Sequence, residues 1–114
     1  MALEIRKRLD FWINFFDIEW EWDNTSVDGV FEKIVEALPE WSKVVFNFEK
    51  LVFCNSKFLW NMFYFIEQLW LKKWKACIIW INKWIIDTFE VVWMFDMLPI
   101  YENLQDVLNY LNNN

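Results

Sequence analysis

The sequence predicts one small α/β domain with a mainly parallel central sheet, an N-terminal β-hairpin and four helices, in the order β-β-α-β-α-β-α-β-α. Two short apolar runs at residues 44–48 and 76–79 are typical of buried strands. They alternate with segments whose apolar residues recur at helical spacing. Such alternation favours parallel strands joined by right-handed crossovers. At 114 residues the chain suits one hydrophobic core, and we expect a domain at 1–111 followed by a disordered tail at 112–114.

The N-terminal elements follow from local pattern. Residues 3–9 and 13–21 have strand character and are separated by a short turn, which predicts a hairpin. Residues 25–28 resemble a capping box, so a helix is expected to begin there and to run to about Leu38. Pro39 then ends this helix.

The remaining elements alternate between strand and helix. A strand is expected within residues 43–53, and Ser56 opens the next helix. The later elements are a strand at 76–79, a helix at 85–92, a short strand within 94–100 and a last helix at 104–111 capped by Asn103.

The composition argues against several classes of function. The net charge of −6 disfavours non-specific nucleic-acid binding, which needs a basic surface. The chain has no histidine and a single glycine, so it lacks the commonest general base and any glycine-rich phosphate loop. We therefore expect no enzyme activity, no cofactor and no metal site.

The sequence also predicts a cytoplasmic location. No apolar run approaches the roughly 18–20 residues that a membrane span needs, and the N-terminal ten residues do not resemble a signal peptide. Cys54 and Cys77 lie in apolar runs and are expected to be reduced residues of the core.

The tryptophan content is anomalous. The chain has ten tryptophans and one glycine, whereas average usage predicts roughly eight glycines in a chain of this length. Four tryptophans fall at turns or helix ends, where a left-handed backbone would favour glycine: Trp12, Trp41, Trp74 and Trp93. One hypothesis is that the source reads the UGA codon as glycine; the alternative is that the tryptophans are genuine.

Three segments, in order, resemble the STAS domain family of the anti-sigma-factor-antagonist type. The family's Gly-Glu-hydrophobic-Asp stretch matches residues 20–23, its acidic-Ser-small-Gly-Leu-Gly loop matches residues 55–60, and its C-terminal pattern beginning with Tyr matches residues 101–108. Five tryptophans fall where the family has glycine, which supports the codon hypothesis: Trp20, Trp60, Trp74, Trp80 and Trp93.

The resemblance implies a function. In this family the serine of the second segment, here Ser56, is phosphorylated by an anti-sigma factor that is also a serine kinase, and ATP and Mg²⁺ belong to that partner. Phosphorylation ends the interaction and so regulates transcription. Asp23 and Asn24, at the end of the hairpin strand, are expected to lie beside the Ser56 loop at one edge of the sheet. The predicted partner-binding residues are Asp23, Asn24, Asn55 and Lys57. Three positions depart from the pattern: Asn47 stands where the strand usually has Asp, Asn55 replaces an acidic residue, and Phe58 replaces a glycine.

Simpler interpretations stay open at these residues. Ser56 is also the expected N-cap of its helix, and a capping serine needs no other role. Asp23 and Asn24 would equally suit the start of the first helix, and Lys57 a solvated surface. The same fold could serve as a protein-interaction or scaffold module that is never phosphorylated.

Overall fold

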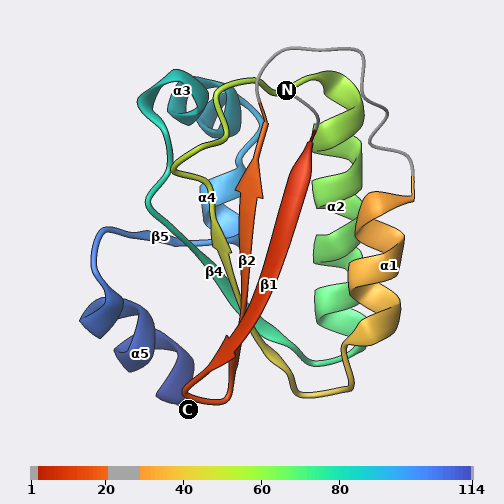
Figure 1. Cartoon of the computed structure of the whole chain (residues 1–114), viewed down its shortest axis with the longest axis vertical. Helices are drawn as coiled ribbons and strands as arrows, with labels where there is room; N and C mark the ends of the chain where they lie inside the picture. The colour runs from red at the N-terminus through yellow and green to blue at the C-terminus, as the bar shows by residue number, and fades with distance from the viewer. Residues whose placement is uncertain (1–2, 21–28, 114) are drawn as a thin grey trace.

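A five-stranded sheet forms the centre of the computed structural model, which describes residues 3–20 and 29–113 (Figure 1). The strands lie side by side in chain order: β1 (Glu4–Asp10), β2 (Ile13–Glu19), β3 (Lys43–Asn47), β4 (Lys75–Ile79) and β5 (Ile100–Tyr101). Strand β1 is antiparallel to β2, and every later pair is parallel. The predicted hairpin and mainly parallel sheet are confirmed.

The described residues form five helices: α1 (Val30–Ala37), α2 (Ser56–Leu71), α3 (Lys83–Val91), α4 (Met94–Met97) and α5 (Leu104–Asn112). Each parallel strand is added on the same side of the one before it. Right-handed crossovers therefore place α1, α2 and α3 on one face of the sheet. Helix α5 follows the last strand and covers part of the opposite face, as Figure 1 shows.

The larger core lies between the sheet and the helices α1 to α4, and it is built from aromatic rings. Phe46 on β3 is fully buried at its centre. Its ring centroid lies 4.8 Å from that of Phe65 on α2, 5.5 Å from Phe48 and 6.0 Å from Phe31 on α1. A smaller core lies beneath α5, where Val107 and the neighbouring apolar residues face the sheet. Both faces of the central strands are thus buried.

One predicted strand is wrong in part. Residues 94–97 form the short helix α4, and only Ile100 and Tyr101 form the strand β5. Met94 and Leu98 are both fully buried, and Leu98 N–H donates to the Met94 carbonyl at 2.8 Å. An apolar pair four residues apart suits one helical turn, and sheet pairing begins only at the Pro99 carbonyl.

Four tryptophans have a left-handed backbone. They are Trp12, Trp41, Trp80 and Trp93, with φ between 54° and 68°, and are referred to below as the left-handed tryptophans. The expectation for Trp74 is wrong, because Lys73 holds the left-handed position after α2 with a φ of 58°. Trp74 instead packs its ring on Phe65 and donates its indole N–H to the Pro39 carbonyl at 2.7 Å.

The last helix ends one residue inside the segment 112–114, and the predicted domain bounds stay a prediction. Helix α5 includes Asn112, whose side-chain oxygen accepts a hydrogen bond from Lys43 at 2.7 Å. The carbonyl of Asn113 accepts one from Lys75. These two lysines on neighbouring strands hold the end of α5 against the sheet. The expected capping box at 25–28 lies outside the described residues.

Truncation of the central ring should be costly. We expect Phe46→Ala to lower the free energy of unfolding by about 3–5 kcal/mol, because it removes a fully buried ring and leaves a cavity. Urea denaturation followed by circular dichroism measures the change. Leu71→Ala, at a side chain that is 67% exposed on α2, is the control and should shift the free energy by less than about 0.5 kcal/mol. Equal losses in the two variants would contradict this description of the core.

Candidate functional site: the junction before helix α2

Ser56 lies where an extended loop passes into α2. It is the first residue of the helix, and its side chain is exposed. The described part of the structure gives its hydroxyl no hydrogen-bond partner. The predicted position of Ser56 at the start of this helix is confirmed, and the hydroxyl is open to solvent.

The cap of α2 is Asn55, not Ser56 as predicted. Asn55 has an extended backbone, with φ −119° and ψ 176°, and its side-chain oxygen accepts a hydrogen bond from Phe58 N–H at 2.9 Å. Ser56 already belongs to the helix, so its own hydroxyl cannot reach the amides that a cap satisfies. This leaves the hydroxyl of Ser56 without a structural task.

Phe58 anchors the first turn of α2 in the core. It is fully buried, and its ring meets Phe31 edge-on at 5.5 Å between centroids. Trp20 lies 6.0 Å from the same ring and packs edge-on against Phe53 at 4.7 Å. Phe58, which stands where the family has glycine, therefore holds the start of α2 against the core.

The end of β2 lies beside the loop that leads to Ser56. Trp20 N–H donates to the Lys50 carbonyl at 3.2 Å, and Val52 N–H donates to the Trp20 carbonyl at 2.9 Å. The chain beyond Trp20 carries Asp23 and Asn24, which lie outside the described residues. Their predicted contact with a partner stays a prediction.

The other two predicted contact residues lie at the junction itself. Lys57 is exposed on the first turn of α2, and its carbonyl accepts a hydrogen bond from the Asn61 side chain at 2.8 Å. Asn55 is half-buried and is occupied as the cap. The structure therefore brings Asn55, Ser56 and Lys57 together at one helix end, as their sequence order requires.

Both cysteines are free thiols within the described chain. Cys54 precedes the cap and is half-buried, whereas Cys77 is buried in β4 beneath α5. Burial raises the pKa of each thiol to about 12. The thiols are therefore neutral near pH 7, and the predicted burial of the cysteines is confirmed for Cys77 and in part for Cys54.

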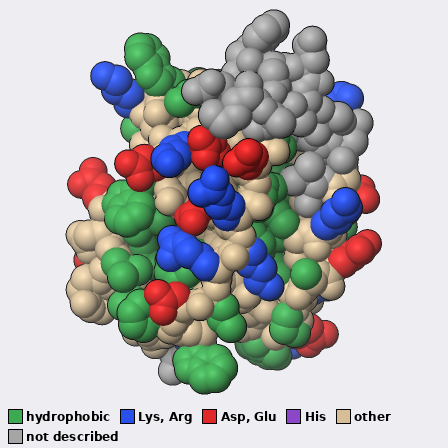
Figure 2. Space-filling model, in the orientation of Figure 1, with side chains coloured by type: hydrophobic (Ala, Val, Ile, Leu, Met, Phe, Trp, Pro, Cys, Tyr) green, Lys and Arg blue, Asp and Glu red, His purple; other side chains and the backbone are tan. Residues whose placement is uncertain are grey.

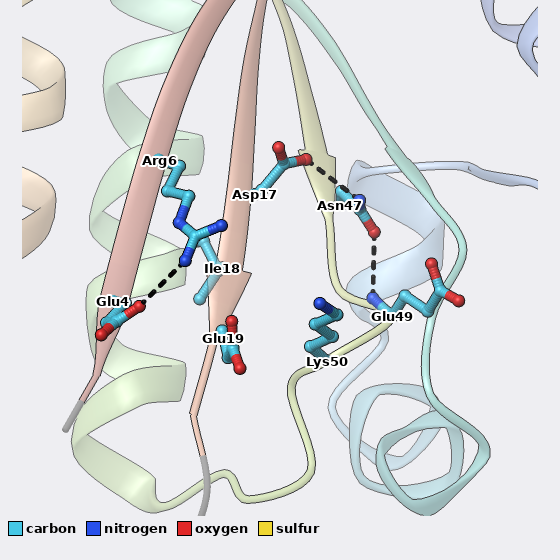
Figure 3. Close-up of a pocket in the computed structure, with 8 residues that line it drawn as sticks. All are labelled: Glu4, Arg6, Asp17, Ile18, Glu19, Asn47, Glu49 and Lys50. Carbon is cyan, nitrogen blue, oxygen red and sulfur yellow. Dashed lines mark hydrogen bonds and ion pairs between the residues drawn. The ribbon is translucent and has the colours of Figure 1, made fainter. Parts of the chain in front are cut away.

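A polar hollow of about 250 Å³ lies on the face of β1, β2 and β3 that α5 leaves uncovered (Figure 3). Figure 3 shows Asp17 and Asn47 pointing toward each other from neighbouring strands, with 3.0 Å between the amide nitrogen and the carboxylate. Partial burial raises the pKa of Asp17, but hydrogen bonds from Arg8 and Asn47 outweigh it and hold that pKa below its usual value. Figure 2 shows basic and acidic side chains mixed over this face.

Charged side chains of both signs line this hollow. Its lining contains four carboxylates and two basic side chains, and Arg6 pairs with Glu4 at 3.5 Å. Across residues 3–20 and 29–113, no group of three or more Cys, Asp or Glu side chains is placed to hold a metal ion. Within the same residues, no helix has the length and apolar character to cross a membrane.

Two solved structures are similar to the chain over almost its whole length. An anti-sigma factor antagonist from Mycobacterium paratuberculosis matches 97% of the chain and 95% of its own length, with a TM-score of 0.79 and 12% identity. An anti-sigma-factor antagonist (STAS) domain protein from Planctomyces limnophilus matches 99% of the chain and all of its own length, with the same score and identity. The chain has the STAS fold.

The sequence itself carries a weaker signal. No family profile matches it, and no curated protein sequence matches it significantly. The resemblance stated from three short segments is confirmed as a likeness of fold, which includes the N-terminal hairpin and the helix that begins at Ser56. Sequence reasoning missed Asn55 as the cap and Phe58 as the anchor of this STAS fold.

Removal of the cap should weaken the start of α2. We expect Asn55→Ala to lower the free energy of unfolding by about 1 kcal/mol, because Phe58 N–H loses its acceptor. Asn55→Asp keeps an acceptor and should lose much less. Thermal or urea denaturation measures both variants. Ser56→Ala should change the free energy of unfolding by less than about 0.5 kcal/mol. A larger loss in Ser56→Ala than in Asn55→Ala would show that Ser56, and not Asn55, caps the helix.

The thiols should react slowly in the folded protein. With a pKa of about 12, each thiol is almost entirely protonated at pH 8, so labelling by iodoacetamide should be far slower than in urea. In the unfolded chain the pKa returns to about 9, so the thiols favour the folded state below pH 9, and this contribution declines between pH 9 and pH 12. Peptide mass spectrometry after timed labelling measures the rate at each cysteine. Rapid labelling of native Cys77 would contradict its burial.

Proposed function

We propose that the chain is a regulatory protein of the anti-sigma-factor-antagonist type, acting in the cytoplasm. In this proposal it binds an anti-sigma factor that is also a serine kinase, and phosphorylation of Ser56 ends the binding. The observation that carries the proposal is the exposed hydroxyl at the first residue of α2, on a fold shared with an anti-sigma factor antagonist. The kinase supplies ATP and Mg²⁺, and this chain supplies the hydroxyl and a docking surface.

The environment of Ser56 suits a phosphate. The amides of a helix N-terminus and the helix dipole stabilise an anion there. The start of α2 is held by the Asn55 cap and by the buried ring of Phe58, neither of which uses the Ser56 hydroxyl. A phosphate on Ser56 therefore leaves the fold intact.

The switch acts on the partner's side of the interface. A phosphate adds about −1.5 to −2 charges at neutral pH, on a chain whose net charge is already −6. A partner that packs over the start of α2 must remove water from this dianion, which opposes binding without any change of conformation.

The neighbours of Ser56 have separate parts in the proposal. Lys57, exposed on the same turn, pairs with the phosphate or with a partner carboxylate. Asn55 offers the partner its amide nitrogen, because its oxygen is bonded to Phe58 N–H. Asp23 and Asn24 follow the segment that pairs with the loop at Trp20, and they extend the contact surface.

A second candidate function is an interaction or scaffold module that is never phosphorylated. The departure at Asn55 favours it, because the resemblance expects an acidic residue directly before the phosphorylated serine. The buried Phe58 also makes the first turn more rigid than a glycine would. In this function the same face binds a partner constitutively.

The two functions separate in one experiment. The cognate kinase and ATP should place phosphate on Ser56, detected by peptide mass spectrometry, and Ser56→Asp should weaken the complex at least tenfold in calorimetry. Gln105→Asp is the matched control, since it adds the same charge to the exposed first turn of α5, and it should bind as the parent does. Binding by Ser56→Asp at parental affinity, with no phosphate on Ser56, would select the scaffold function.

A further inference from the structure

Most of the residues with an unusual left-handed backbone in this chain are tryptophans. Six non-glycine residues of the described chain have positive φ, and four of them are tryptophans, although tryptophan supplies only ten of the 114 residues. L-residues with a β-carbon are disfavoured in this region, which glycine enters freely. The one glycine, Gly29, has the same backbone, with a φ of 75°.

The hairpin turn gives the sharpest case. Asp10 pairs with Ile13, so the turn between β1 and β2 has two residues, Phe11 and Trp12. Both have positive φ, 53° and 63°, which is the geometry of a type I′ turn. The second position of such a turn strongly prefers glycine, and here it holds Trp12.

The other three left-handed tryptophans also stand where chains use glycine. Trp93 follows the C-cap residue of α3, and its N–H donates to the Glu90 carbonyl at 3.1 Å, as that of a glycine in this position does. Trp80 directly follows β4 with a φ of 54°, and Trp41 follows the Pro39 turn with a φ of 68°. A left-handed residue is needed at each place for the chain to change direction.

The four indoles contribute little to the core. Trp12 is 87% exposed, Trp93 71%, Trp41 68% and Trp80 43%. Figure 2 shows large hydrophobic side chains standing out from the edge of the molecule. The described phenylalanines are mostly buried by contrast, so exposure is not general to the aromatic residues of this chain. The contacts that the four indoles make with polar and charged groups also lie outside the core. One example is the Lys73 ammonium, which lies 5.0 Å from the centre of the Trp41 ring.

We propose that the left-handed tryptophans are encoded by UGA codons that the source organism reads as glycine, so the native protein carries glycine at these four positions. This inference assigns the codon hypothesis to named positions by their backbone, and it is independent of the proposed function. It does not rest on the buried Trp20 and Trp74, which fill the core of this structure.

The inference changes what the surface offers a partner. With glycine at the four positions, the turns no longer carry exposed apolar indole rings. Stacking of nucleic acid on these rings is then excluded as a function, which agrees with the net charge of −6. Binding surfaces must be sought elsewhere on the domain.

The direct test reads the gene and the protein together. UGA codons at the four positions, with glycine in the tryptic peptides of the protein purified from its source, are the expected result. UGG codons would overturn the inference, and so would UGA codons whose peptides carry the mass of tryptophan.

A second test measures how replacement of each left-handed tryptophan by glycine changes the stability of the fold. In recombinant protein, each of Trp12→Gly, Trp41→Gly, Trp80→Gly and Trp93→Gly should lower the unfolding equilibrium constant about two- to tenfold, because relief of the left-handed strain exceeds the added freedom of the unfolded chain. Trp60→Gly is the matched control, since Trp60 is 72% exposed but lies inside α2 without positive φ. It should raise the same constant, because glycine weakens a helix. Loss of stability in all five variants would overturn the inference.

Discussion

The packing of Trp20 between Phe53 and Phe58 fixes the junction on which the candidate site depends. It ties the end of β2 to the loop after β3 and to the first turn of α2, two adjoining segments that are distant from β2 in the sequence. Phe58 is fully buried, and the side chain of Asn55 caps its N–H, so α2 begins at Ser56. The exposure of Ser56 follows, since a first-turn residue two positions before a buried one faces away from the core.

Most of the fold could be predicted because its signals are local. Alternating and continuous apolar runs indicated the strands, and spacings of three and four indicated the helices. The prediction for residues 94–100 was wrong in part, because the segment has too few apolar residues to distinguish one helical turn from a short strand. Burial of both Met94 and Leu98 favours the helical turn over the strand. This burial arises only when α3 and β5 have packed around the segment.

The candidate site could be predicted in position but not in detail. Asn55 and Ser56 are both good capping residues, and sequence alone cannot say which of two neighbours leaves the helix first. The extended backbone of Asn55 settles this, and tertiary packing of Phe58 imposes it. The end of the hairpin strand could be placed beside this loop from the sequence, but the hydrogen bonds that Trp20 makes there depend on the parallel pairing of β2 with β3.

A switch that works by charge requires a support that does not respond to that charge. At the start of α2 the cap and the anchor are made by the residues on either side of Ser56, so the free hydroxyl can change its chemistry while its support stays the same. The neutral thiol of Cys54 and the amide of Asn55 add no negative charge near the phosphate. In the proposed function, the free energy of a phosphate on Ser56 would therefore be expressed in the interface with a partner rather than in the fold.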